Sequence, residues 1–166
     1  MWWRSSTGAW NACETRSELA DCSRMSAEDD VRAAVDRETS AWDTQDVDLL
    51  LSVFHPDMVW PWPRTYTSVD PADWRLVLGR FDADRWRTVY EELFANYELV
   101  HNRRNVEKIE VSAEGDGAFA VVDIDTLWRE RATGDESNHW LGRTCKVYAL
   151  MPDGWKMTMQ TGALQY

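Results

Sequence analysis

The sequence is poor in the residues that build metal centres and disulfide frameworks. Its 166 residues include only three cysteines and three histidines. The cysteines form no CxxC pair and no two histidines stand in an HxH or HExxH arrangement, so a metal site would need carboxylates from distant parts of the chain. We therefore predict no metal, no cofactor and no disulfide framework. The residues concerned are Cys13, Cys22, Cys145, His55, His101 and His139.

Long apolar runs and basic residues are also scarce. The longest apolar stretches, such as 118–122, fall far short of the roughly 20 residues that a membrane-spanning helix needs. Eighteen basic residues against 29 acidic ones give a net charge of −11, which repels nucleic-acid phosphates and anionic lipids. No glycine cluster follows a strand and opens a helix, so no phosphate loop is predicted. We expect a soluble protein of the cytoplasm that binds neither nucleic acid nor membrane.

Tryptophan, in contrast, is abundant. The eleven tryptophans bring a large apolar area, and each has one N–H group that needs a partner when buried. Two interpretations stay open: a tryptophan-rich core, or a cavity lined by aromatic rings for an apolar or ring-shaped ligand.

The first 25 residues show neither helical nor strand periodicity. We predict a loosely ordered N-terminal extension over 1–25 and one domain over 26–166. Charged residues interrupt any apolar segment of a signal peptide in the extension. It is either an upstream addition to the domain or an arm that docks on a neighbouring molecule through Trp2, Trp3 and Trp10.

Helices are predicted at the start of the domain. Ser26, followed by acidic residues, is an N-cap signal, and apolar residues then repeat at spacings of three and four as far as Trp42. Glu38 is the one charged residue on that apolar stripe. A second, short helix should contain Phe54 as an inward-facing residue and end there, because Pro56 disfavours the helical conformation of the residue before it.

The middle of the domain is predicted to contain a strand, a loop and a third helix. The strand covers 58–60, and the loop holds a short helix capped at 70–71, where proline follows aspartate. Asp82 or Asp84 opens the third helix, whose apolar stripe over 86–97 is the cleanest in the chain.

From about Val100 the apolar period changes to two, which predicts strands. Turn sequences at 114–117, 133–135 and 152–154 divide this region into four successive antiparallel strands. Even-numbered positions over 118–131 are mostly apolar, so they should face the helices. The strand over 139–151 carries apolar residues on both sides, which indicates that both faces of the sheet are buried there. The helices would bury the inner face, and a second copy of the chain would bury the outer face in a dimer interface. Helices followed by such a meander indicate an α+β fold.

The order of these elements resembles the nuclear transport factor two-like superfamily, which includes SnoaL-like cyclases, ketosteroid isomerase, scytalone dehydratase and the association domain of calmodulin-dependent kinase. The resemblance covers about 26–166 and rests on Trp42, the segment 51–57, the strand 58–60 and the closing hairpin 153–157. It implies a conical half-barrel in which a curved, mostly antiparallel sheet packs on three N-terminal helices. It also implies a hydrophobic cavity between sheet and helices, and a homodimer.

The resemblance also directs attention to proton-transfer residues. Ketosteroid isomerase-like members use a carboxylate at the end of the first strand, where this chain has Pro61, so a base must come from elsewhere. Glu38 is the best candidate because it lies on an apolar stripe, although a glutamate in that position more often pairs with a basic residue or reaches the rim. Dehydratase-like members use a histidine within the cone, which makes His101, and less readily His139, a second candidate. Either histidine could instead be a surface residue beside a turn.

A lysine is the predicted polar contact for a ligand. Lys146 occupies the place of a buried arginine in the kinase association domain, and it shares the even face of its strand with Trp140 and Tyr148. If that face is inward, Lys146 would anchor a carboxylate or phenolate; otherwise it reaches water along the sheet surface. We expect Arg103 and Arg104 to be solvated residues paired with nearby acids.

These observations predict a small-molecule-binding protein of SnoaL-like type with an aromatic-lined cavity. It would be an isomerase, cyclase or dehydratase acting on an apolar ring-bearing substrate with a polar substituent. The alternative is a non-catalytic dimerisation or ligand-carrier module whose tryptophans fill the core. The catalytic candidates are Glu38 and His101. The expected ligand-binding residues are Trp42, Trp60, Trp86, Tyr90, Trp128, Lys146 and Tyr148.

Overall fold

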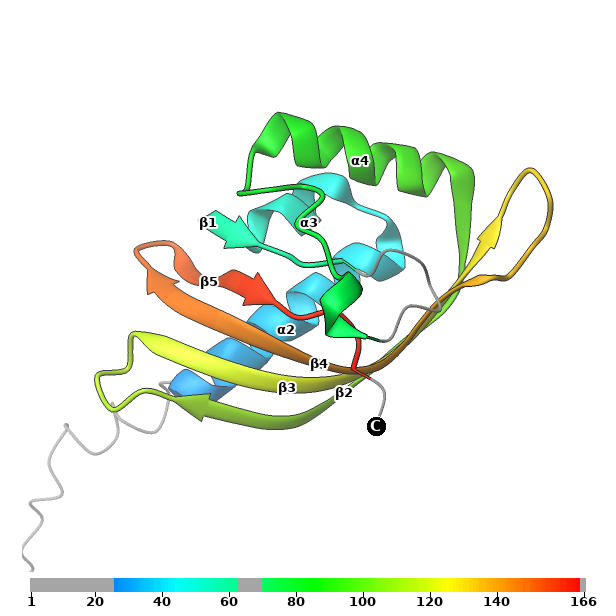
Figure 1. The fold of residues 1–166 in the computed structure, drawn as a ribbon. Helices are drawn as coiled ribbons and strands as arrows, with labels where there is room; N and C mark the ends of the chain where they lie inside the picture. The colour runs from blue at the N-terminus through cyan, green and yellow to red at the C-terminus, as the bar shows by residue number, and fades with distance from the viewer. Residues whose placement is uncertain (1–25, 63–69, 165–166) are drawn as a thin grey trace, which may run out of the picture.

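The computed structural model describes residues 26–62 and 70–164, which form helices packed on one curved, unclosed sheet (Figure 1). The strand order across the sheet is β1-β5-β4-β3-β2. This is the predicted α+β conical half-barrel. The elements in chain order are α2 (Ala27–Thr44), α3 (Val47–Ser52), β1 (Phe54–Val59), η1 (Pro71–Asp73), α4 (Ala83–Asn96), β2 (Tyr97–Val111), β3 (Gly117–Glu130), β4 (Asn138–Met151) and β5 (Gly154–Gln160).

Helix α2 begins and ends where its sequence provides caps. The Ser26 hydroxyl accepts a hydrogen bond from the backbone N–H of Asp29, whose carboxylate accepts one from the backbone N–H of Ser26, so both orphan donors are satisfied. The helix ends at Gln45, which adopts the left-handed conformation with φ of 53°. Its buried stripe carries Glu38 and Trp42 into the interior, at 0% exposure each.

The second helix is shorter than the sequence predicts. Helix α3 ends at Ser52, and Phe54 is the first residue of β1 rather than the last inward residue of the helix. Pro56 lies inside β1, which is possible because β1 is an edge strand and a proline there removes no hydrogen bond that the sheet needs. The prediction for Phe54 was wrong about its element, although its side chain is buried at 4% exposure.

Helix α4 lies over the upper end of the fold (Figure 1). The Asp82 carboxylate caps it by accepting a hydrogen bond from the backbone N–H of Arg85 at 2.9 Å, so Asp82 rather than Asp84 opens the helix. Trp86, Tyr90 and Phe94 form its buried stripe, as their spacing predicts. The predicted short helix before it is η1, capped by Asp70.

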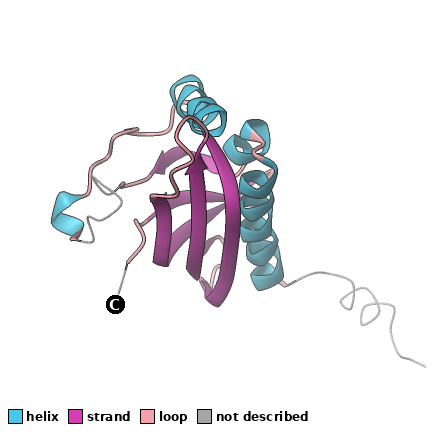
Figure 2. Cartoon of the chain, turned by 90° about the vertical axis from the view of Figure 1, so that its right-hand side faces the viewer, coloured by secondary structure: helices cyan, strands magenta, loops and turns pink. Residues whose placement is uncertain are grey.

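Strands β2 to β5 pair as an antiparallel meander, and β1 adds an edge strand by pairing in parallel with β5. Along β3 the even positions are buried and the odd ones are partly exposed, so the even face lies against the helices as predicted. Lys146 on β4 faces the same way, because Ala120 is its cross-strand partner. Figure 2 shows the sheet with the long helix on one side only.

Irregularities in β2 help to bend the sheet. The register with β3 shifts between Leu99 and His101 and again between Val106 and Lys108. Such bulges increase the local twist and redirect the side chains that follow. The first shift places His101 on the outer face and Asn102 on the inner face.

None of the helices in the described ranges has the length and apolar character needed to cross a bilayer. The predicted N-terminal extension over 1–25, with its tryptophans, lies outside the described residues. The division into an extension over 1–25 and one domain over 26–166 therefore stays a prediction.

Candidate functional site

A buried ion cluster lies between α2 and the inner face of the sheet. The Lys146 ammonium group donates hydrogen bonds to a Glu38 carboxylate oxygen and to the Gln160 side-chain oxygen. Glu38 comes from α2, Lys146 from β4 and Gln160 from β5, so the cluster ties three elements together. The side chains of Glu38 and Lys146 are both fully buried. The even face of β4 is thus inward, and Lys146 does not reach water along the sheet surface.

Arg104 is the third charge of this cluster, contrary to the prediction that it is a solvated residue. Its guanidinium donates to the other Glu38 oxygen at 2.8 Å and its side chain is only 3% exposed. It also lies over the Trp42 ring, 5.9 Å from the ring centroid, which adds a cation–π contact. The first bulge of β2 explains the error, because it shifts the inward and outward alternation of the residues that follow.

The cluster carries one buried negative charge and two positive ones, and these charges influence the pKa values of Glu38 and Lys146. Burial would raise the pKa of Glu38, but the Lys146 and Arg104 cations overcome it and hold the pKa at about 2. Burial lowers the pKa of Lys146 to about 8, although the Glu38 carboxylate opposes this shift. Glu38 is therefore ionised at neutral pH, whereas Lys146 can exchange a proton close to neutrality.

Aromatic rings surround the cluster. Trp42 is their centre: it makes edge-to-face contacts with rings at centroid distances of 5.4 to 6.2 Å. Its indole N–H donates to Glu38 at 3.1 Å, which joins the aromatic and ionic groups. The seven predicted ligand-binding residues all lie in this region with exposures of 0 to 6%. The rings in contact with Trp42 are Trp60, Tyr90, Phe94, Trp128 and Trp140.

Several polar atoms of this interior have no hydrogen-bond partner among the described residues. They include the hydroxyl groups of Tyr90 and Tyr148 and the indole N–H of Trp128. Burial, followed by the Glu38 charge, raises the pKa of both tyrosines well above the ordinary value, so both hydroxyls lie within the field of the same carboxylate. Buried polar groups in folded proteins are normally paired, and an unpaired one calls for an explanation. Here the two tyrosine hydroxyls lie near Glu38, and the ring of Trp128 contacts Trp42, whose indole donates to Glu38.

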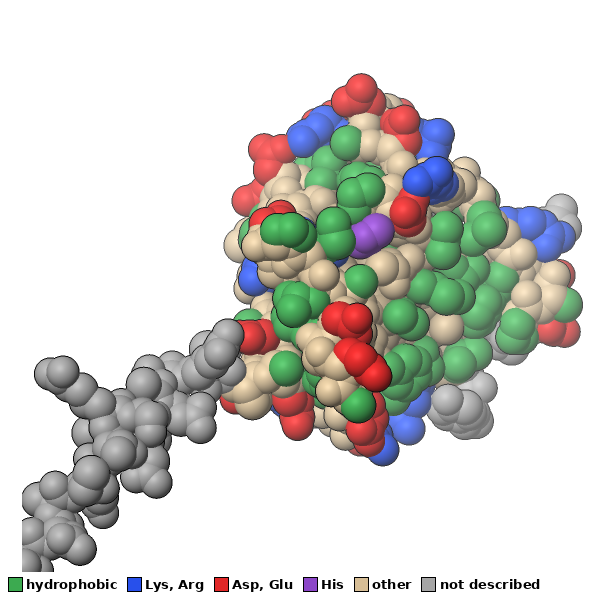
Figure 3. All heavy atoms as spheres, turned by 90° about the vertical axis from the view of Figure 1, so that its left-hand side faces the viewer, with side chains coloured by type: hydrophobic (Ala, Val, Ile, Leu, Met, Phe, Trp, Pro, Cys, Tyr) green, Lys and Arg blue, Asp and Glu red, His purple; other side chains and the backbone are tan. Residues whose placement is uncertain are grey.

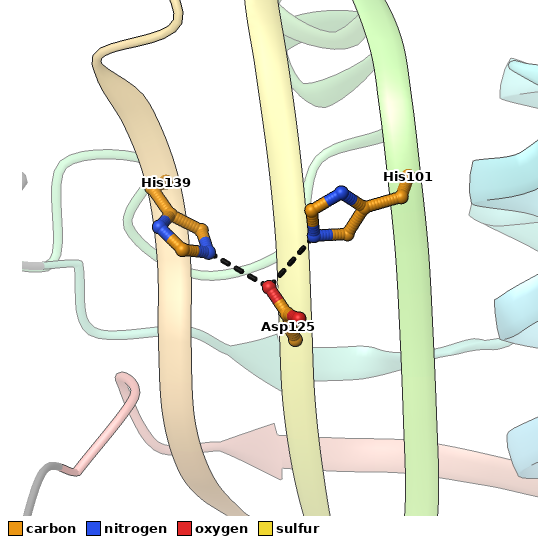
Figure 4. A group of neighbouring side chains, drawn as sticks. All are labelled: His101, Asp125 and His139. Carbon is orange, nitrogen blue, oxygen red and sulfur yellow. Dashed lines mark hydrogen bonds and ion pairs between the residues drawn. The ribbon is translucent and has the colours of Figure 1, made fainter.

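His101, the second predicted catalytic residue, lies elsewhere. It faces the outer side of the sheet, where its Nε2 atom is 2.7 Å from an oxygen of Asp125. His139 approaches the same Asp125 oxygen at 2.7 Å from the other side. Figure 4 shows the carboxylate between the two imidazole rings, which come from the strands on either side of β3. The structure therefore separates His101 from Glu38 and brings it to His139.

A groove of about 690 Å³ adjoins this second cluster on the outer face. Ionic side chains line it: Arg143 makes a two-pronged pair with Asp123 at 2.6 and 2.8 Å, and Arg103 contacts Asp125 at 3.2 Å. Leu141, 44% exposed, is one of its apolar lining residues. The outer face is thus both charged and apolar. Figure 3, which views the molecule from the left-hand side of Figure 1, shows hydrophobic side chains gathered on that side.

Comparison with known proteins identifies the fold. No protein-family model matches the sequence, and no curated protein matches it. A ketosteroid isomerase-like protein from Erwinia carotovora atroseptica has a similar structure, with a TM-score of 0.62 and 15% identity over 84% of this chain and 97% of that one. An NTF2-like protein from Cytophaga hutchinsonii gives a TM-score of 0.63 and 14% identity over 85% and 100% of the two chains. The resemblance to the nuclear transport factor two-like superfamily is thereby confirmed at the level of the fold.

A third similar structure is a candidate dehydratase of the NTF2-like family from Streptomyces avermitilis. Its TM-score is 0.59, with 17% identity over 84% of this chain and 92% of that one. The similarity of all three structures covers most of both chains, so the α+β cone accounts for nearly all of each relative.

Proposed function

We propose that this protein binds a small molecule in its aromatic interior, beside the Glu38–Lys146 ion pair. The ligand would be an apolar ring-bearing molecule with one polar substituent. The observation that carries this proposal is a set of buried polar atoms that have no hydrogen-bond partner in the described part of the chain. They are the hydroxyls of Tyr90 and Tyr148, which lie in the field of Glu38, and the indole N–H of Trp128. A ligand hydroxyl, carbonyl or carboxylate could satisfy these groups while its ring contacts the tryptophans.

The chemistry that fits the site is proton transfer, as in an isomerase, cyclase or dehydratase. An efficient general acid or base has a pKa near the working pH, and Lys146, with a pKa of about 8, meets this condition. Glu38 fits better as the counter-ion that holds Lys146 in place, because a carboxylate with a pKa of about 2 is a weak base. The similarity to a ketosteroid isomerase-like protein and a candidate dehydratase is compatible with this reaction class.

Ligand binding can be tested with a pair of probes that share one ring system. 2-Naphthoate carries an anion and 2-naphthol a neutral hydroxyl, and each is added to the protein while its melting temperature is measured. We expect both to raise the melting temperature. Lys146→Met should weaken the binding of 2-naphthoate but spare 2-naphthol, whereas Lys108→Met on the exposed surface should change neither. Equal losses for both probes, or no stabilisation by either, would contradict the proposal.

A second candidate function is a non-catalytic module whose own rings fill the interior. The close contacts around Trp42 favour it. Tyr90→Phe separates the two candidates, because the substitution removes only the unpaired hydroxyl. In a filled core the variant should be at least as stable as the parent. In a binding site it should lose affinity for 2-naphthol while its fold is unchanged.

The homodimer also stays a proposal, and the outer face of the sheet is the surface that suits it. Phe119, Val147 and Met159 expose 36 to 39% of their area there. Sedimentation equilibrium should find a dimer that Val147→Glu dissociates; a monomeric parent protein would refute the expectation.

We further propose a cytoplasmic location. Among the described residues the one cysteine, Cys145, is a free thiol, which suits a reducing compartment.

A further inference from the structure

We propose that His101, Asp125 and His139 bind one divalent transition-metal ion, for which Zn²⁺ is the simplest probe. The three residues come from three adjacent strands, β2, β3 and β4. Their ligand atoms all lie within 4.8 Å of one another. The proposal concerns the outer face of the sheet and does not depend on the function proposed for the interior.

Strand register explains why these side chains meet. Leu127 of β3 is the cross-strand partner of both His101 and His139. Asp125 lies two residues away on the same strand and therefore on the same face, diagonally below both imidazoles. The two Nε2 atoms approach a single Asp125 oxygen at 2.7 Å from opposite sides (Figure 4). The sheet thus holds three ligand groups on a rigid support.

The distances suit a metal ion after small side-chain rotations. Zinc bonds of about 2.0–2.2 Å to nitrogen and oxygen place neighbouring ligand atoms about 3.3 Å apart in a tetrahedral site. The observed nitrogen-to-oxygen separations of 2.7 Å are shorter than this value. Small rotations of the histidine side chains about χ2 can make up the difference. Arg103 contacts the other Asp125 oxygen at 3.2 Å, which orients the carboxylate and leaves the first oxygen for the ion.

The ligand types favour zinc or a similar transition metal over calcium or magnesium. Imidazole nitrogens suit zinc, copper, iron and nickel, whereas calcium and magnesium take oxygen ligands. Three protein ligands leave a coordination position open, as catalytic zinc sites do and closed structural sites do not. The side chains are 24 to 39% exposed, so an ion can reach them, and Asp125 also lines the adjoining groove. A bound ion would therefore present its open position to solvent beside that groove.

Metal binding is tested on the untagged chain of 166 residues. After dialysis against micromolar Zn²⁺, elemental analysis and native mass spectrometry should find one ion per chain, and Co²⁺ should give the visible absorption of a four- or five-coordinate site. One ion per two chains would overturn the proposal of a site within one chain, and a spectrum of six-coordinate aqueous Co²⁺ would overturn it as well.

Matched variants assign the ligands. His139→Gln and Asp125→Asn should each weaken Zn²⁺ binding by at least about 10-fold. The same type of substitution at the third histidine, His55→Gln, should leave the affinity unchanged, because His55 accepts a hydrogen bond from the Asp57 backbone outside the cluster. If a cluster variant fails to fold, the zinc-dependent rise in melting temperature of the parent chain still tests the site. Equal affinity in all three variants would refute it.

Discussion

Replacing Glu38 by glutamine tests the buried ion cluster most directly. The substitution keeps the size of the side chain but removes the negative charge of the cluster. The Lys146 and Arg104 cations then stay buried together without it. Breaking a buried pair from one side costs about 3–5 kcal/mol. Lys146 can instead become neutral by losing its proton. For a lysine with an ordinary pKa this costs about 5 kcal/mol at pH 7, which is therefore the upper limit of the destabilisation. We expect Glu38→Gln to destabilise the fold by about 3–5 kcal/mol.

Lys146→Met should have a much smaller effect, although it alters the same ion pair. It leaves Glu38 balanced by Arg104 as a one-to-one pair. Burial lowers the pKa of Lys146 from 10.5 to about 8, which corresponds to about 3 kcal/mol of unfavourable burial of its charge at pH 7. Methionine removes this cost of burying a charge, but it also loses the hydrogen bond that Lys146 donates to Gln160. We therefore expect a change within about 1 kcal/mol in either direction.

The double variant gives the sharpest result. Adding Lys146→Met to Glu38→Gln removes one of the two unpaired cations, so the double variant should be more stable than Glu38→Gln alone. Urea unfolding followed by tryptophan fluorescence, at several protein concentrations, provides the free energies. Glu92→Gln on the exposed side of α4 is the control and should change stability by less than about 0.5 kcal/mol. A double variant that is less stable than Glu38→Gln would refute this account of the cluster.

Three further predictions concern pH and the backbone. Because the folded pKa of Glu38 is about 2 against 4.5, Glu38 should contribute about 3 kcal/mol to the stability lost as the pH falls from 4.5 to 2. Asp125, whose pKa is also lowered to about 2 by its hydrogen bonds to His101 and His139, adds to the total loss, so urea unfolding should show the Glu38 contribution as the difference between the parent chain and Glu38→Gln. The lowered pKa of Lys146 should make stability rise with pH above 8, and Lys146→Met should lack that rise. Gly142→Ala should lower the melting temperature, because φ is 139° and the added Cβ would lie 2.5 Å from the Leu164 carbonyl oxygen; an unchanged melting temperature would count against that contact.

Local signals in the sequence account for most of the fold. The caps at Ser26 and Asp82 and the alternation along β3 depend on neighbours a few residues away, and the structure confirms them. The end of the second helix was harder to predict, since Phe54 is buried in either element. Its assignment to β1 depends on pairing with Met157, about a hundred residues later in the chain.

The candidate site was predicted in part. Glu38 stood out as a charge on an apolar stripe, and Lys146 shared a face with aromatic residues, but their pairing joins residues 108 positions apart. Arg104 was missed because a bulge shifts the alternation of β2, and nothing in the sequence marks that bulge. The His101–Asp125–His139 cluster depends on the register of three strands, which turn sequences alone do not fix.

The pairing of β1 with β5 has a consequence for the order in which the chain folds. The first strand of the sheet pairs with the last one, and the backbone N–H of Met157 donates a hydrogen bond to the carbonyl of Val53. During synthesis, β1 must therefore wait for nearly the whole domain to leave the ribosome before its partner strand exists. Chains released before Gly154 would leave β1 unpaired, and Lys146 would lack Gln160; such fragments should be substrates for chaperones and proteases.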